Sequence, residues 1–158
     1  MNCAKTRCMH DPALHIRRAR RTDFVDVMRL LADARLTVPP PDRATLRRFR
    51  QLVADLGADV YLAFVDAALA GLVHVTYARQ LVHAPLARID HLVVAGPVRR
   101  RGVGTALLRL ALARAGKRGC RAVTCTVAPD ASDPTLFLTQ AGFQPSGTRL
   151  RYDLAWDG

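Results

Sequence analysis

Apolar residues recur along the first half of the chain at helical or at strand spacing, and the spacing predicts its elements. Helical spacing predicts amphipathic helices over residues 23–34 and 42–56, with Thr22 placed to cap the first one. A short strand near Leu14 precedes them. Runs rich in β-branched and aromatic residues at 60–65, 69–77 and 88–94 then predict three strands, of which the first two form an antiparallel hairpin.

The second half alternates helices and strands. A strong helix begins near Gly102, and it is followed by a strand at 122–127, a short helix at 133–140 and a last strand at 148–154. This order predicts an α/β fold (α+β, mixed sheet): a mostly antiparallel sheet flanked by helices, with one parallel β-α-β crossover over residues 88–127. Ligands of such sheets tend to bind where the carboxyl end of a strand meets the next helix, here 94–105.

Length and composition favour one domain. The chain has 158 residues, of which 50% are apolar, enough for one core. We expect a flexible leader at 1–12 and a single domain at 13–158. No apolar run approaches the roughly 18 to 20 residues that span a bilayer, and the N-terminus lacks the apolar stretch of a secretory signal, so a cytoplasmic protein without membrane partners is expected.

The cysteine pattern predicts neither a disulfide framework nor a metal site. Of the four cysteines, Cys3, Cys8, Cys120 and Cys125, two lie in the polar leader and one lies inside an apparent strand, which is no disulfide framework for a domain of this size. A reducing compartment is the simpler interpretation. Cys3, Cys8 and His10 supply three ligands with no second half of a zinc site, and no metal is predicted.

The charge is strongly positive, with 24 Lys and Arg against 13 acidic residues, all of them Asp, and a net charge of +11. Such a field attracts nucleic acid, anionic lipid or a phosphorylated small molecule, and charge alone does not choose among them. Aromatic residues make up only 6% of the chain and do not alternate with the basic ones, which disfavours nucleic acid.

The segment between the strand at 88–94 and the next helix has the composition of a phosphate-binding loop. Backbone N–H groups and the positive end of a helix dipole converge there, the two glycines let an anion approach the backbone, and arginines add charge. Position 107 is Leu and no Gly-Lys-Ser/Thr ending is present, which excludes the dinucleotide and triphosphate loops. The predicted diphosphate cradle consists of Arg99, Arg100, Arg101, Gly102, Val103, Gly104 and Thr105.

Three segments in order resemble one family. Arg-x-x-Gly-x-Gly at 99–104, preceded by Ile-Asp-His-Leu-Val-Val at 89–94, resembles the acetyl-CoA-binding core of the GNAT superfamily of N-acetyltransferases, and Phe-Leu-Thr-Gln-Ala-Gly-Phe at 137–143 is similar to its later helix and Gly-Phe turn. The resemblance covers about 14–154. It implies transfer of an acetyl group from acetyl-CoA, the cosubstrate, to a primary amine by direct attack on the thioester. The resemblance is also compatible with a homodimer.

The resemblance also assigns roles to the backbone. It implies that Leu92, Val93 and Val94 lie at a bulged, splayed part of the sheet and pair with the pantetheine arm, and that one N–H there stabilises the oxyanion. The cradle at 99–105 would hold the pyrophosphate. The side chains of the three strand residues are expected to pack in the core in either case.

The candidates for the base that removes the proton of the amine lie on the same strand. Asp90 is the leading candidate, although it would equally suit an ionised partner of Arg88 in a polar patch. His91 is the alternative base. Adjacent strand positions point to opposite faces, so we expect at most one of the two to act. His74 and His83 are weaker candidates.

The general acid is missing from its usual position. The resemblance places Leu138 where the family often has a tyrosine. Water, Tyr77 or Tyr152 would then protonate the leaving thiolate, or no acid is needed. The same gap leaves open a non-catalytic, regulatory acyl-CoA-binding module. The sequence does not identify the acceptor.

Overall fold

The computed structural model describes residues 13–34, 36–128 and 132–147 and divides the chain into two compact units, 1–126 and 127–158. The expected leader at 1–12 and the last strand at 148–154 lie outside the described residues, and the single domain over 13–158 stays a prediction. No helix in the described ranges is both long and apolar enough to span a membrane. The cytoplasmic location stays a prediction as well.

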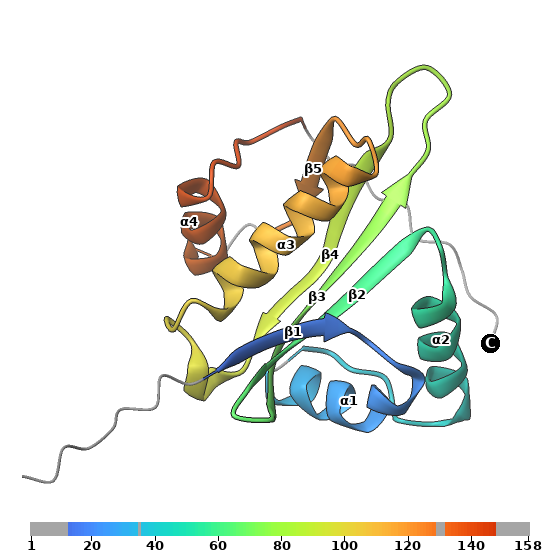
Figure 1. Ribbon diagram of the computed structural model, residues 1–158, viewed down its shortest axis with the longest axis vertical. Helices are drawn as coiled ribbons and strands as arrows, with labels where there is room; N and C mark the ends of the chain where they lie inside the picture. Colours follow the sequence, from blue (N-terminus) through green and yellow to red (C-terminus); the bar gives the residue numbers. More distant parts are fainter. Residues whose placement is uncertain (1–12, 35, 129–131, 148–158) are drawn as a thin grey trace, which may run out of the picture. The chain divides into compact units, whose positions relative to one another are not determined.

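The first unit contains a five-stranded sheet with three α-helices (Figure 1). Its elements are β1 (Leu14–Arg18), α1 (Phe24–Asp33), α2 (Arg43–Ala54), β2 (Ala58–Val65), β3 (Ala68–Ala78), β4 (Leu86–Val94), α3 (Val103–Lys117) and β5 (Ala122–Cys125), with short 3-10 turns at Arg21–Asp23 and Gly96–Val98. The second unit contains α4 (Ser132–Gln140). These elements confirm the predicted order as far as it is described.

The strands follow one another in sequence order across the sheet, and all neighbours are antiparallel except β4 and β5. The predicted parallel crossover is therefore β4-α3-β5. The hairpin turn at Asp66 and Ala67 has two positive φ angles, 48° and 66°, which suit the twist of a two-residue hairpin. Because the sheet is mostly antiparallel with one parallel pair, the predicted fold class is confirmed.

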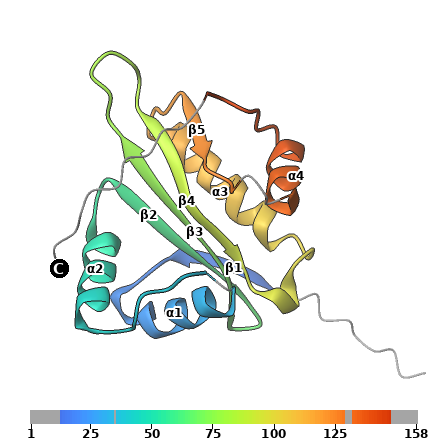
Figure 2. The same cartoon turned by 180° about the vertical axis from the view of Figure 1, so that it is seen from behind.

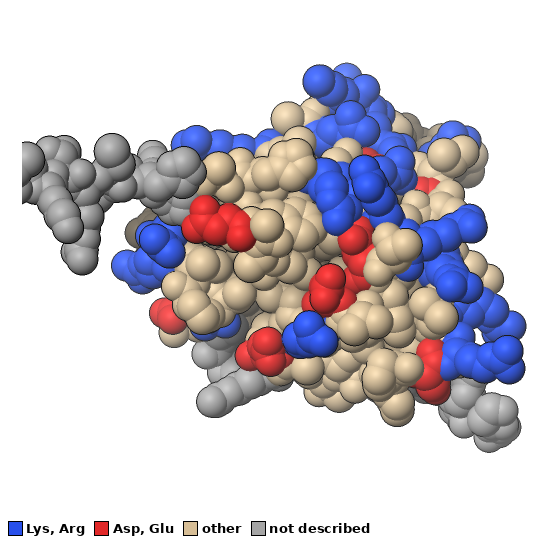
Figure 3. Space-filling model, turned by 60° about the horizontal axis from the view of Figure 1, so that its bottom comes forward, with Lys and Arg blue, Asp and Glu red and all other residues tan. Residues whose placement is uncertain are grey.

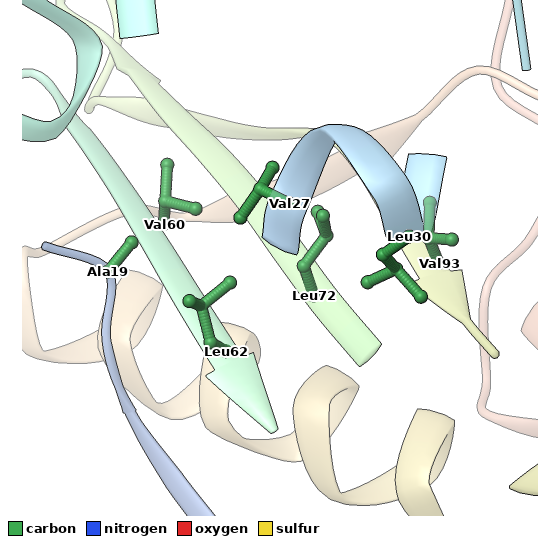
Figure 4. Packing of buried hydrophobic residues seen from close by; sticks show 7 residues of the cluster. All are labelled: Ala19, Val27, Leu30, Val60, Leu62, Leu72 and Val93. Atoms are coloured by element: carbon green, nitrogen blue, oxygen red, sulfur yellow. The ribbon is translucent and has the colours of Figure 1, made fainter. Parts of the chain in front are cut away.

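The helices of the first unit cover opposite faces of the sheet (Figures 1 and 2). Val27 and Leu30 of α1 join strand residues in one buried cluster, drawn in Figure 4, and α2 packs against the same cluster. The cluster consists of Ala19, Val27, Leu30, Val60, Leu62, Leu72 and Val93. On the other face α3 approaches Gly71, where an added Cβ would meet the Val93 carbonyl oxygen at 2.7 Å. Only glycine permits this close packing.

The start of α1 differs from the expectation. Asp23, not Thr22, occupies the N-cap position, after a 3-10 turn. The Asp23 carboxylate accepts hydrogen bonds from both Arg17 Nη atoms, at 2.7 and 2.8 Å, and from the Arg20 N–H at 2.6 Å. These bonds tie the end of β1 to the helix, which explains why the helix begins one residue later.

Candidate functional site

The strands β4 and β5 separate halfway along β4. Their pairing runs from Leu86 opposite Ala122 to Ile89 opposite Cys125, and β5 ends there. From Asp90 to Val94, β4 has no paired neighbour on the β5 side among the described residues, while His91 to Val94 still pair with β3. The resemblance implied such a splayed region at 92–94, and the structure has it over 90–94.

A β-bulge lies at the point of separation. His91 pairs with His74 of β3, whereas Ile89 pairs with Val75, so Asp90 is an extra residue without a partner on β3. A bulge places two consecutive side chains on one face of the sheet. Asp90 and His91 both contact His74, the carboxylate at 3.9 Å and the ring by stacking. The prediction that the two point to opposite faces is therefore wrong, because it assumed regular alternation.

The Asp90 carboxylate is held from three sides. Thr76 Oγ1 donates a hydrogen bond to Oδ2 at 2.7 Å, and Arg88 Nε donates one to Oδ1. His74 Nδ1 lies 3.9 Å from Oδ2. The Asp90 side chain is 18% exposed. Both carboxylate oxygens therefore already accept hydrogen bonds at the edge of an open surface.

Two imidazole rings stack beside this carboxylate. The rings of His74 and His91 are 5.8 Å apart between centroids and nearly parallel, at 12°. Burial lowers the pKa of His74 and outweighs the opposing effect of Asp90. Its Nε2 is buried without a hydrogen-bond partner in the described part of the chain. His91 is exposed. The cluster thus combines a buried imidazole, whose pKa is lowered, with an accessible one.

The predicted cradle follows β4 directly. Arg100 and Gly102 have positive φ angles of 64° and 83°, and an added Cβ at Gly102 would meet no protein atom. The first helical hydrogen bond of α3 runs from the Ala106 N–H to the Gly102 carbonyl oxygen (2.9 Å), so three N–H groups precede it. The open space, turned backbone and helix start fit an anion.

The side chains of the cradle divide into two groups. Val103 is 2% exposed and anchors the start of α3 in the core. The other predicted members outside the half-buried Gly104 are exposed: Arg99, Arg100, Arg101, Gly102 and Thr105. Arg99 Nε also donates to the carbonyl oxygen of Val94 at 3.3 Å, which links the loop to the end of β4. Three exposed arginines therefore directly precede the backbone donors at the start of α3.

The residues predicted beside the pantetheine arm pack as expected for their side chains. Val93 is 8% exposed and belongs to the core cluster, while Leu92 and Val94 are half-buried. Their backbone lies on the unpaired stretch of β4.

Tyr77, proposed from the sequence as a general acid, lies on the other face of the sheet. Its hydroxyl donates to Asp59 Oδ2 at 2.9 Å, and Arg118 lies 4.1 Å from the centroid of its ring. Burial and the bond to Asp59 raise its pKa. Leu138 lies on α4 and is buried, and Tyr152 lies outside the described residues. Tyr77 is thus held away from the Asp90 cluster.

Sequence reasoning missed Thr76 and gave His74 little weight. The signal was present, because His74 and Thr76 are polar residues at alternate positions of the largely apolar β3. Cys125 marks the last pair before β4 and β5 separate, and burial, with a smaller effect of Asp90, raises the pKa of its thiol. Within the described ranges no three His, Cys or Asp side chains gather to hold a metal, and the leader's Cys3, Cys8 and His10 lie outside them.

Comparisons with known proteins identify the family and the fold. The family model described as "Acetyltransferase (GNAT) family" matches residues 24–143, and the chain belongs to this family. No curated protein sequence matches it significantly. Among solved structures, a transcriptional regulator from Bacillus halodurans C-125 is 25% identical over 90% of this chain and 100% of its own, with a TM-score of 0.81.

Two further structures share the fold at lower identity. The aminoglycoside N-acetyltransferase AAC(6')-Iy in complex with CoA is 18% identical over 90% of this chain and 95% of its own, with a TM-score of 0.80. Glucosamine-6-phosphate N-acetyltransferase from Arabidopsis thaliana is 15% identical over 90% of this chain and 99% of its own, with a TM-score of 0.77.

Proposed function

We propose that this chain transfers the acetyl group of acetyl-CoA to the primary amine of an acceptor by direct attack on the thioester. The observation that carries the proposal is the succession, along one strand and the loop after it, of the polar cluster at Asp90, the unpaired edge at 90–94 and the cradle at 99–105. Family membership supports the reaction class. Structural relatives include an acetyltransferase determined with CoA.

Each part of the site has a task in this reaction. The N–H groups at the start of α3, with Arg99, Arg100 and Arg101, would bind the pyrophosphate. The unpaired backbone of Leu92, Val93 and Val94 would bind the pantetheine arm as an added strand. One N–H of this stretch would donate to the carbonyl oxygen of the thioester and stabilise the oxyanion that forms there. Bound acetyl-CoA supplies the acetyl group as a thioester.

The geometry favours His91 over Asp90 as the base. Both Asp90 oxygens already accept hydrogen bonds from Thr76 and Arg88, whereas the His91 ring is exposed. An exposed imidazole nitrogen can accept the proton of the attacking amine. In this arrangement Asp90 acts as a positioning residue that orders Arg88 and His74. The sequence had ranked the two candidates in the opposite order.

Binding of the cosubstrate is the first test. Isothermal titration of acetyl-CoA, CoA and dephospho-CoA should give tight binding to the wild type, and Gly102→Asp should abolish it by placing a carboxylate in the cradle. Gly119→Asp is the matched control, because Gly119 also has a positive φ (73°) and open space around it, but lies after α3. Equal loss in both variants, or no binding to the folded wild type, would contradict the cradle.

Turnover then separates the enzyme from a silent binder. Leu138, in the place of a tyrosine, favours the alternative of a non-catalytic acyl-CoA-binding module. Thiol release with a panel of primary amines should show turnover that His91→Gln lowers at least about a hundredfold, as expected for the loss of a general base. Tight acetyl-CoA binding without thiol release for any amine would support the alternative. The homodimer stays a prediction, and the mass of the protein in solution tests it.

A further inference from the structure

Arg88 has a free hydrogen-bonding edge beside the proposed base. Its side chain is 47% exposed, and only Nε is engaged, with Asp90 Oδ1. No partner of Nη1 or Nη2 is found among the described residues. The end of a guanidinium presents two parallel donors that match a carboxylate or a phosphate. Arg88 is therefore ordered by one anion and equipped to bind a second.

Arg88 lies on the same face of the sheet as His91. It pairs with Thr76 on β3 and His91 pairs with His74, and both β3 side chains contact Asp90. Thr76 and His74 are two positions apart on β3, so the two β4 side chains start roughly 7 Å apart along the sheet. This spacing suits a small molecule that spans from the guanidinium to the imidazole.

The helix α2, which packs on this face over β2, adds positive charge. Four arginines of α2 are exposed: Arg43, Arg47, Arg48 and Arg50. No acidic residue lies within α2 itself. In Figure 3 the molecule is turned so that the bottom of Figure 1 comes forward. Blue Lys and Arg side chains dominate the right-hand side of this view, where α2 lies. Asp90 offsets the charge of Arg88, so these arginines and the net charge of +11 supply the attractive field.

We propose that Arg88 binds an anionic group of the acceptor, a carboxylate or a phosphate, and thereby determines specificity. The acceptor is a small amine with its negative charge several bonds from the nitrogen. The guanidinium holds the anion through Nη1 and Nη2 while the amine faces His91. This inference rests on the proposed acetyl transfer and adds the substrate class to it.

Matched pairs of amines test the proposal. One pair is 6-aminohexanoate and 6-aminohexanamide, and the other is glucosamine 6-phosphate and glucosamine, so that the two pairs distinguish a carboxylate from a phosphate. Thiol release gives kcat/KM for each. The wild type should prefer the anionic member of at least one pair by about ten- to hundredfold, as hydrogen bonds to a charged group contribute.

Variants separate Arg88 from the overall charge. Arg88→Gln should remove most of the preference, mainly through KM, and Arg88→Lys should keep part of it. Any effect of the substitution on Asp90 cancels in the ratio of the two kcat/KM values, because the two members of a pair share the same amine chemistry. Arg109→Gln, an exposed arginine of α3 on the other face, removes the same charge and should leave the preference unchanged within about twofold.

Several outcomes would overturn the proposal. One is equal turnover of both members of each pair by the wild type, and another is an equal loss for both members in Arg88→Gln. A preference that persists in Arg88→Gln and weakens only with salt belongs to the overall field. If no probe is turned over, the four ligands are titrated against CoA-loaded protein, and absence of tighter binding by the anions overturns it equally. Failure of the folded wild type to bind acetyl-CoA would instead contradict the proposed function itself.

Discussion

Asp59 and Asp90 lie on opposite faces of the same sheet and have contrasting surroundings. Asp59 is fully buried, bonded to the Tyr77 hydroxyl, and has Arg18 and Arg118 at 3.3 and 3.2 Å. Asp90 is also bonded to an arginine and a hydroxyl, but its neighbours Arg88 and His91 are exposed. The same carboxylate chemistry thus closes one face of the sheet and leaves the other open to a reaction.

The contrast teaches how to separate a structural cluster from a functional one. Around Asp59, the aromatic ring and the guanidinium also bind each other, since Arg118 stacks on Tyr77 and donates to the carbonyl oxygen of Leu56. Around Asp90, Arg88 Nη1 and Nη2 and His74 Nε2 have no partner among the described residues. Asp59 Oδ1 also has no hydrogen bond in the described part of the chain, but it is buried beside Arg18 at 3.3 Å. Unused hydrogen-bonding groups that are also exposed, as on Arg88, therefore distinguish the Asp90 side.

The largest effect is expected from Asp59→Asn. The substitution leaves two arginines around a buried neutral amide, and breaking a buried ion pair from one side costs several kcal/mol. Because both arginines are partly exposed, we expect the free energy of unfolding to fall by about 3 kcal/mol, the lower end of that range. Urea denaturation measures it. A loss below about 1 kcal/mol would show that Asp59 is no more structural than an exposed residue.

The same substitution at Asp90 should act on catalysis instead. Asp90→Asn keeps the shape but weakens the bonds to Thr76 and Arg88, and we expect the free energy of unfolding to fall by about 1 kcal/mol. The kcat/KM for amine acetylation should fall about tenfold, because His74 and Arg88 lose their common partner. Steady-state thiol release measures the rate. An unchanged rate with a large loss of stability would reverse the comparison between the two aspartates.

The sequence predicts the Asp90 region less well than the rest of the fold, and the reason is local. Apolar periodicity found the hairpin of β2 and β3 and the crossover through α3, since these elements bury a regular face. The cradle could be proposed from the sequence because Gly102 and the arginines before it have distinctive chemistry. The bulge has no such signature: β4 contains neither Gly nor Pro. Its only trace is the pair of polar residues at 90 and 91, where alternation would place one.

A smaller effect is expected from Thr76→Val, which removes one hydrogen-bond donor from Asp90 while keeping the shape of the side chain. A hydrogen bond to a charged group contributes about 1.5 to 3 kcal/mol, and because Arg88 still holds Asp90, we expect only about 1 kcal/mol of it to affect the reaction, so kcat/KM should fall roughly fivefold. Thr124→Val is the control, because Thr124 bonds the Ala87 carbonyl oxygen at a longer 3.4 Å and does not contact Asp90. Equal changes in both variants would mean that the bond to Asp90 has no special role.

The smallest effect concerns the pH dependence of stability, which the buried His74 introduces on the open face. Burial lowers its pKa, with Asp90 opposing and His91 and Arg88 adding to the shift. A depressed pKa in the folded state means that this contribution to stability is complete above the pKa of the unfolded chain, about 6.5, and is lost as the pH falls below it. Urea denaturation between pH 8 and pH 5 should therefore show a declining free energy of unfolding.

Replacing the ring isolates that contribution. His74→Gln cannot be protonated, so its stability should vary less with pH over the same range, whereas His83→Gln, in the exposed loop between β3 and β4, should follow the wild type. An NMR titration of the wild type should place the pKa of His74 below its usual value, and Asp90→Asn should lower it further, because the carboxylate is the group that opposes burial. If Asp90→Asn raised the pKa of His74 instead, Asp90 would not be the partner that holds the two imidazoles, and the contrast with the closed site at Asp59 would lose its electrostatic basis.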